Sequence, residues 1–154
     1  MKDFFIIKDS APAIGWATCV VLYPSINATS NPNLFELIMC YISVFTGSFI
    51  LEIICDIRDY NGDNKQGIKS LPVQLGMLKT KAIINILNIF SAIVILLLVF
   101  SGIISYPWLL FVVNNILVYI LVNYMFEKLK GNRLISHILI FFQIILTIIL
   151  GFIS

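Results

Sequence analysis

The sequence predicts an all-α fold, a multi-pass membrane helical bundle of about five transmembrane helices in one domain, residues 1–154. Hydrophobic residues make up 60% of the chain, and the mean hydropathy is +1.00. Charged residues make up only 12%, whereas a soluble domain carries about 25%. Polar segments divide the chain into apolar runs of a length suited to crossing a bilayer. The net charge of +2 is too small and scattered to predict a nucleic-acid partner.

The first two expected spans are residues 13–27 and 34–55, separated by a polar turn. The first is close to the ~17-residue minimum for a helix that crosses the hydrocarbon core. We expect Pro12 to open this helix in its first turn and Pro24 to end or kink it.

The longest hydrophilic segment follows, and we expect a loop over residues 57–80. Gly76 is expected to end a short helix within this loop, because glycine adopts the left-handed conformation common after helix ends. The remaining expected spans are residues 81–104, 108–126 and 134–153.

The ten basic residues fall in three segments that five spans would bring to one side of the membrane. By the positive-inside rule, that side is cytoplasmic or its organellar equivalent. The segments are Lys2 with Lys8, the region from Arg58 to Lys81, and Lys128 with Lys130 and Arg133.

Four carboxylates with helical spacing mark the start of the polar segment. Glu52, Asp56, Asp59 and Asp63 are four, three and four positions apart, which places them on one face of a helix. Like charges at such spacing repel, so a cation would stabilise them. Mg²⁺ prefers oxygen ligands and often joins one or two carboxylates to substrate phosphates.

The simpler interpretation is a solvated polar loop next to an apolar segment. Two features favour a site instead. The acidic residues begin inside an apolar run, where carboxylates are costly, and basic residues follow at once. This pattern suits a lipid-like substrate with a charged head, such as a prenyl diphosphate. Arg58, Lys65 and Lys69 are the candidate contacts to its phosphate oxygens.

The segment of residues 56–76 reads DIRDYNGDNKQGIKSLPVQLG. It resembles the second aspartate-rich motif of the UbiA superfamily of intramembrane prenyltransferases, DxxDxxxD followed by a glycine, a basic residue and Leu-Pro-Val-x-x-Gly. The resemblance implies Mg²⁺-dependent transfer of a prenyl group from a diphosphate to a lipophilic, usually aromatic acceptor, as in quinone biosynthesis. It implies that Asp56, Asp59 and Asp63 bind the metal and the diphosphate, and that Lys69 occupies the basic position.

Complete members of that superfamily have about nine spans and a further motif of the form NxxxDxxxD, which this sequence does not match. The resemblance therefore covers the C-terminal half of the nine-helix fold. A separate N-terminal half is an expected partner. The alternative is a non-catalytic or degenerate membrane homologue, or an assembly partner, that binds isoprenoid diphosphates without turnover.

Several other polar side chains fall within the expected spans. Asn85 and Asn88 share a helix face and would either line a cavity or bond to a neighbouring helix. We interpret His137 as a structural residue, because no second ligand is near it in sequence. The residues expected to make interhelical contacts are Asn114, Asn115, Asn123 and Gln143.

Overall fold

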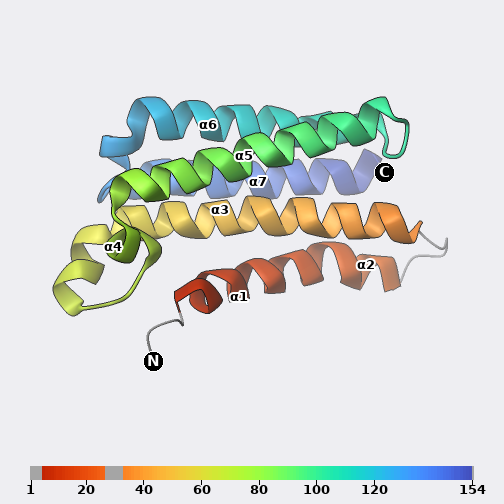
Figure 1. Ribbon diagram of the computed structural model, residues 1–154. Coiled ribbons are helices and arrows are strands. Elements are labelled where there is room, and N and C mark those ends of the chain that lie inside the picture. The colour runs from red at the N-terminus through yellow and green to blue at the C-terminus, as the bar shows by residue number, and fades with distance from the viewer. Residues whose placement is uncertain (1–4, 27–32, 154) are drawn as a thin grey trace.

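The computed structural model describes residues 5–26 and 33–153, without the side chains of residues 5–7, 9, 143 and 146–153. This described part consists of helices joined by short turns and contains no strand, and its long helices run side by side (Figure 1). The predicted all-α membrane bundle is confirmed. In chain order the elements are α1 (Phe5–Ala17), the π-helical turn η1 (Thr18–Leu22), α2 (Tyr23–Ile26), α3 (Leu34–Gln66), α4 (Leu71–Leu75), α5 (Met77–Phe100), the 3₁₀ turn η2 (Tyr106–Trp108), α6 (Leu109–Leu129) and α7 (Arg133–Ile153).

Three helical segments are long and apolar enough to cross a bilayer: α3, α5 and the segment Tyr106–Leu129. Two further apolar helices, Ser10–Ile26 and Arg133–Phe142, are shorter within the described residues. That these two helices also cross the membrane, which would bring the total to five spans, therefore stays a prediction.

Pro12 lies inside α1, so the prediction that it opens the first helix is wrong. The helix already includes Phe5, seven positions earlier in the sequence. This earlier start lets Lys8 reach Asp56 of α3, with 3.4 Å between Nζ and Oδ1.

Pro24 does not end the first helix, which continues to Ile26 as α2. Proline has no N–H and so cannot donate to the carbonyl four residues earlier. The preceding turn widens into the π-helical η1, where the Tyr23 N–H bonds to the Thr18 carbonyl. The Ser25 hydroxyl adds a bond to the Val21 carbonyl at 2.6 Å.

α3 extends past the predicted span of residues 34–55 and ends only at Gln66. The Asn33 side chain caps its start by accepting from the Phe35 N–H at 3.0 Å, and Gly67 ends it with a φ of 69°. A helix of 33 residues spans ~50 Å, whereas the hydrocarbon core is ~30 Å thick. α3 is therefore long enough for its polar end to extend beyond the hydrocarbon core.

The expected loop over residues 57–80 is largely helical, so that prediction is wrong. The end of α3, all of α4 and the start of α5 occupy most of it. The prediction for Gly76 is confirmed, since this residue follows α4 with a φ of 82° and donates to the Pro72 carbonyl. Hydropathy alone could not separate a polar helix from a polar loop.

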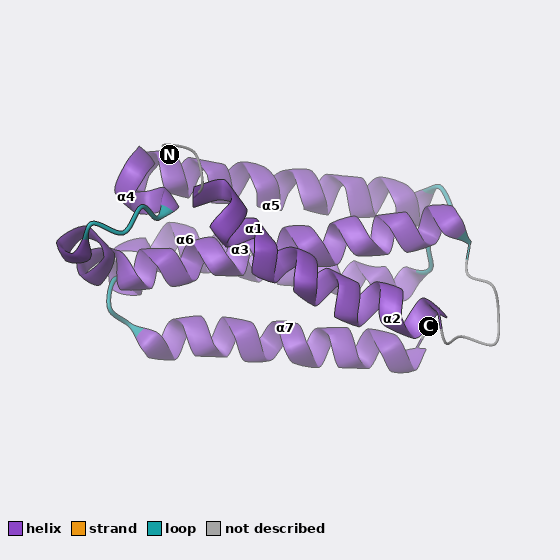
Figure 2. Cartoon of the chain, turned by 90° about the horizontal axis from the view of Figure 1, so that it is seen from below, coloured by secondary structure: helices purple, strands orange, loops and turns teal. Residues whose placement is uncertain are grey.

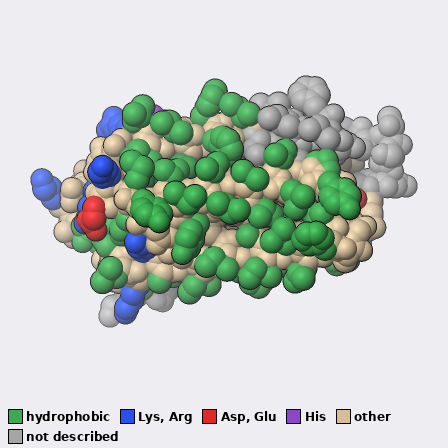
Figure 3. Space-filling model, turned by 90° about the horizontal axis from the view of Figure 1, so that it is seen from above, with side chains coloured by type: hydrophobic (Ala, Val, Ile, Leu, Met, Phe, Trp, Pro, Cys, Tyr) green, Lys and Arg blue, Asp and Glu red, His purple; other side chains and the backbone are tan. Residues whose placement is uncertain are grey.

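Buried side chains form two apolar clusters around α3, which packs against α1, α5, α6 and α7 (Figure 2). One cluster lies toward the polar end of α3 and includes Ile53, Ile57, Ile84 and Val122. The other lies toward the far end and includes Trp108, which stacks on Phe111. The space-filling view shows apolar side chains over much of the bundle surface and charged ones gathered at one end (Figure 3).

That charged end gathers the three basic segments predicted to share a side. The Gly131 N–H of the α6–α7 turn bonds to the Arg58 carbonyl of α3 at 2.8 Å. Lys130 lies over the Tyr60 ring, and Lys8 pairs with Asp56. Lys2 lies outside the described residues. The grouping is confirmed, and the side of the membrane that it faces stays a prediction.

The amides of α5 and α6 connect these two helices. Asn85 and Asn123 exchange hydrogen bonds of 3.2 and 3.1 Å, and Asn115 donates to Ser91 at 3.2 Å. These contacts confirm the helix-bonding alternative for Asn85 and the expectation for Asn115 and Asn123. Asn88 is buried, and neither of its amide atoms has a hydrogen bond to another described residue. Asn114 is buried too, and His137 is exposed. The Gln143 side chain lies outside the described residues.

Candidate functional site

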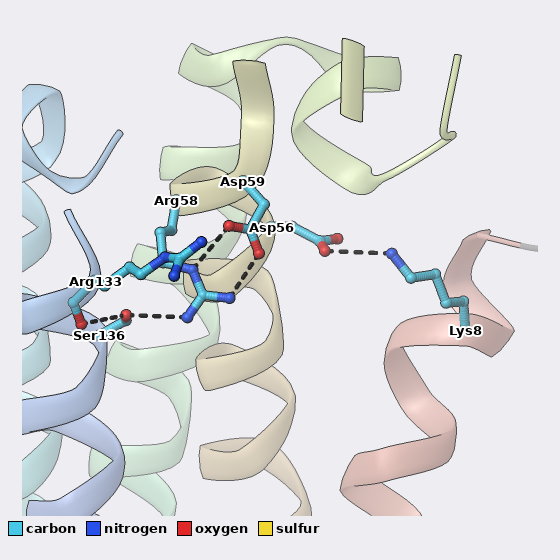
Figure 4. Close-up of polar contacts among 6 residues, drawn as sticks. All are labelled: Lys8, Asp56, Arg58, Asp59, Arg133 and Ser136. Carbon is cyan, nitrogen blue, oxygen red and sulfur yellow. Dashed lines mark hydrogen bonds and ion pairs between the residues drawn. The ribbon is translucent and has the colours of Figure 1, made fainter. Parts of the chain in front are cut away.

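The candidate site lies at the polar end of α3, where the helix carries its aspartates past the apolar segment. Asp56 is 9% exposed, Asp59 is exposed and Asp63 is half-buried. The close-up shows Asp56 reaching toward α1, while Asp59 is paired with Arg58, which bonds onward to α7 (Figure 4). The helical spacing thus puts the carboxylates at one end of the bundle, but Asp56 and Asp59 have different partners.

Asp56 has one oxygen in an ion pair with Lys8, and the backbone N–H of Leu71 also acts on its carboxylate. Its Oδ1 accepts a hydrogen bond from Lys8 Nζ at 3.4 Å. Its Oδ2 is buried and has no hydrogen-bond partner among the described residues. A buried, unpaired carboxylate oxygen is costly, so this atom is suited to a cation or a donor from a ligand. Sequence reasoning did not assign Lys8 to the site; its position on the same side of the membrane was the available signal.

Arg58 binds Asp59 through two nitrogens, with 2.9 Å from Nε to Oδ1 and 2.6 Å from Nη2 to Oδ2. Its third nitrogen donates to the Ser136 hydroxyl at 3.3 Å, and that hydroxyl donates to the Arg133 carbonyl at 2.9 Å. The Arg58 hydrogen bonds hold the pKa of Asp59 below its usual value. Arg58 therefore ties α3 to α7, and its expected contact with phosphate stays a prediction.

Asp63, Lys65 and Lys69 surround the end of α3. The Asp63 carbonyl accepts from the N–H groups of Gly67 and Ile68, which closes the helix. Lys65 lies in the last turn of α3, and Lys69 lies between α3 and α4 with its side chain exposed. No group of three His, Cys, Asp or Glu side chains in the described part of the chain could hold a metal ion by itself.

A pocket of about 220 Å³ lies between α1, α3 and α7. Glu52 lines it from α3, one helical turn before Asp56. A second pocket of about 200 Å³ lies between α5 and α6 and is lined by Asn88 and Asn115. The first pocket shares α1 and α3 with the Lys8–Asp56 pair, so it belongs to the same region as the candidate site.

Comparison with protein families matches residues 1–145 to the UbiA prenyltransferase family. The chain belongs to this family. No curated protein and no solved structure matched the chain. UbiA membership and the apolar helices indicate an integral membrane protein with a membrane prenyltransferase fold. The resemblance found in residues 56–76 is thereby confirmed at the level of the family.

UbiA membership implies Mg²⁺, although no three carboxylates of the described residues come together around one ion. Asp56, Asp59 and Asp63 offer the hard oxygen donors that Mg²⁺ prefers. Mg²⁺ commonly keeps several waters and takes one or two carboxylates plus substrate phosphates, so a cage of three protein ligands is not required.

Proposed function

We propose that this chain supplies the second aspartate-rich half-site for Mg²⁺-dependent transfer of a prenyl group from a prenyl diphosphate to a lipophilic acceptor. The observation that carries the proposal is the state of Asp56. This carboxylate is buried at the polar end of a membrane helix, with one oxygen held by Lys8 and the other without a hydrogen-bond partner among the described residues. It directly follows Cys55, which lines a pocket between three helices.

Each residue of the site has a separate role in the proposal. Asp56, Asp59 and Asp63 supply oxygen ligands, with Asp56 the main one, and Lys65 and Lys69 contact phosphate oxygens as point charges. Arg58 positions Asp59 through its two hydrogen bonds. Mg²⁺, when bound, would neutralise the charge on the departing diphosphate.

The surrounding helices supply the apolar environment for the transferred group. An allylic cation reacts with water, so the helices next to the site must exclude water until the acceptor arrives. The walls contributed by Trp16, Leu51 and Ile140 suit this requirement. The prenyl chain would extend from the polar end of α3 into the membrane interior.

The partner in this proposal is an N-terminal half that carries the NxxxDxxxD motif on the opposite wall of the cavity. The charged end of the bundle would face the cytoplasm or its organellar equivalent, because the basic residues gather there. The substrate head would then reach the site from that side.

A binding measurement with the chain in lipid nanodiscs tests the proposal. The probe is a radiolabelled, non-hydrolysable thiodiphosphate analogue of geranylgeranyl diphosphate, with Mg²⁺ or with EDTA. We expect Mg²⁺-dependent binding that weakens at least tenfold in Asp56→Asn and in Asp63→Asn. Glu127→Gln is the matched control, because Glu127 is an acidic residue in the last turns of α6 whose side chain is 79% exposed.

Three results would count against the proposal or restrict it. The half-site would be wrong if the analogue bound equally well in Mg²⁺ and in EDTA. It would also be wrong if Asp56→Asn and Asp63→Asn bound the analogue as tightly as Glu127→Gln. If the analogue binds but geranylgeranyl diphosphate itself gives no prenyl transfer after addition of a UbiA-family N-terminal half and an acceptor, the alternative is favoured, a protein that binds isoprenoid diphosphates without turnover.

A further inference from the structure

The pocket between α1, α3 and α7 has apolar walls with one polar strip. Pro12 and Trp16 of α1 and Ile140 and Ile144 of α7 form the apolar walls. Ser48 and Glu52 of α3 form the polar strip, one helical turn apart. A pocket meant only for hydrocarbon would have no use for these two groups, because polar atoms are costly in a membrane interior.

Ser48 differs from the other hydroxyl residues of α3. Ser43 and Thr46 each donate to the carbonyl four residues earlier, at 2.8 Å to Met39 and 2.8 Å to Ile42. Ser48 is 8% exposed, yet its Oγ makes no hydrogen bond within the described structure. A buried hydroxyl without a partner is costly, and a serine in a helix can usually satisfy itself by bonding backward. The Ser48 hydroxyl therefore suits a polar group inside the pocket.

The pocket is partly open, and its volume limits the part of a ligand that it can enclose. A cavity of ~150 Å³ holds benzene, so about 220 Å³ holds one substituted six-membered ring. A chain of three or four isoprene units does not fit in that volume. The pocket is therefore suited to a compact head group and not to the whole prenyl chain.

We propose that Ser48 and Glu52 bind a hydroxyl group on the head of the acceptor. The Glu52 carboxylate would accept a hydrogen bond from that hydroxyl, and the Ser48 hydroxyl would donate one to its oxygen. Glu52 precedes Asp56 by one turn, ~6 Å along the helix, so the acceptor head would lie next to the diphosphate end of the donor. Identifying the occupant as the acceptor rests on the proposed function, whereas the hydroxyl-binding pocket does not.

Quenching of Trp16 fluorescence tests this pocket directly. Trp108→Phe leaves Trp16 as the single tryptophan, since the sequence contains two. The probes are 4-bromophenol and 4-bromoanisole, whose bromine quenches a nearby indole. They are similar in size, but only the phenol has a hydroxyl to donate.

We expect saturable quenching by 4-bromophenol and at least fivefold weaker binding of 4-bromoanisole. Ser48→Ala and Glu52→Leu should each weaken phenol binding about fivefold, the effect of one hydrogen bond of ~1 kcal/mol. Ser43→Ala should leave it unchanged, because that hydroxyl bonds to its own helix and does not line the pocket. The comparison of the two probes needs no change at Ser48 or Glu52, so it holds even if those variants fold poorly.

Equal binding of the two probes, or equal effects of Ser43→Ala and Ser48→Ala, would overturn the proposal. If diphosphate binding still needs Mg²⁺ and Asp56 in that case, the proposed function survives. If phenol binding needs Ser48 and Glu52 while diphosphate binding fails, the assignment of the occupant as the acceptor is wrong.

Discussion

Lys8 of α1 and Asp56 of α3 form an ion pair across 48 positions of sequence, with 3.4 Å between Nζ and Oδ1. The pair joins the first helix to the polar end of the central one. It occupies one carboxylate oxygen, and the other is buried with no hydrogen bond to another described residue. The lysine therefore holds Asp56 in place, and its charge lies where a metal ion would also bind.

Replacing Lys8 by methionine should strengthen Mg²⁺ binding. Two unit charges ~4 Å apart interact by ~1 kcal/mol in water, so removing the competing ammonium should raise the Mg²⁺ affinity about fivefold. The measurement is a Mg²⁺ titration at saturating diphosphate analogue, with Lys130→Met as the control because Lys130 pairs with Glu127 instead. A lower Mg²⁺ affinity in Lys8→Met would contradict competition between the lysine and the metal.

The Arg58–Asp59 pair should make stability depend on pH in the acidic range. The folded pKa of Asp59 is lowered, so the pair stabilises the fold above the unfolded-state pKa of ~3.9. This stabilisation is lost as the pH falls through the folded pKa. The difference in melting temperature between the wild type and Asp59→Asn should be full at pH 6 and shrink toward pH 3. A difference that grows on acidification is the opposite of this expectation.

Two glycines near the end of α3 should respond in opposite directions to alanine. Gly67 has a φ of 69°, which strains an alanine by ~1 kcal/mol, so Gly67→Ala should lower the free energy of unfolding. Gly62 lies inside the helix, and an added Cβ would meet nothing within 4 Å. Gly62→Ala should therefore stabilise the chain by ~0.5–1 kcal/mol. Thermal unfolding in detergent measures both, and equal effects of the two changes would be inconsistent with a helix that ends at Gly67.

The amide pair of Asn85 and Asn123 should be energetically coupled. A double-mutant cycle with Asn85→Ala and Asn123→Ala should give a coupling energy of ~0.6–1.7 kcal/mol, the range of hydrogen bonds between membrane helices. The parallel cycle with Asn85→Ala and Asn115→Ala should be additive, because Asn115 bonds to Ser91 instead. Additive effects in the first cycle would show that the reciprocal bonds of 3.2 and 3.1 Å do not stabilise the bundle.

Hydropathy and turn chemistry predicted the parts of the fold that depend on local sequence. The apolar helices follow from runs of Ile, Leu and Phe, and the end of α4 follows from Gly76. The helical structure of the polar end of α3 was not predicted, because composition distinguishes polar from apolar segments and does not distinguish a helix from a loop. Its true end depends on the left-handed conformation of Gly67.

The partners of the site residues were the least predictable feature. The spacing of Asp56 and Asp59 places them near one helix face. Their partners differ: Asp56 pairs with Lys8, whereas the Arg58 that binds Asp59 also bonds to Ser136. These partners come from α1 and α7, so they depend on how the helices pack. Arg58, whose contact with phosphate stays a prediction, forms hydrogen bonds to Asp59 and Ser136 that its sequence position did not indicate.

The central claim is that Asp56 binds a divalent cation together with a diphosphate, and Mn²⁺ electron paramagnetic resonance tests it most directly. Mn²⁺ takes the place of Mg²⁺, and the signal of the free ion falls as the ion binds. With the thiodiphosphate analogue present, the wild type and Glu127→Gln should remove the free signal, and Asp56→Asn should leave most of it. Equal loss of the signal in Asp56→Asn, or no loss in the wild type, would contradict the claim.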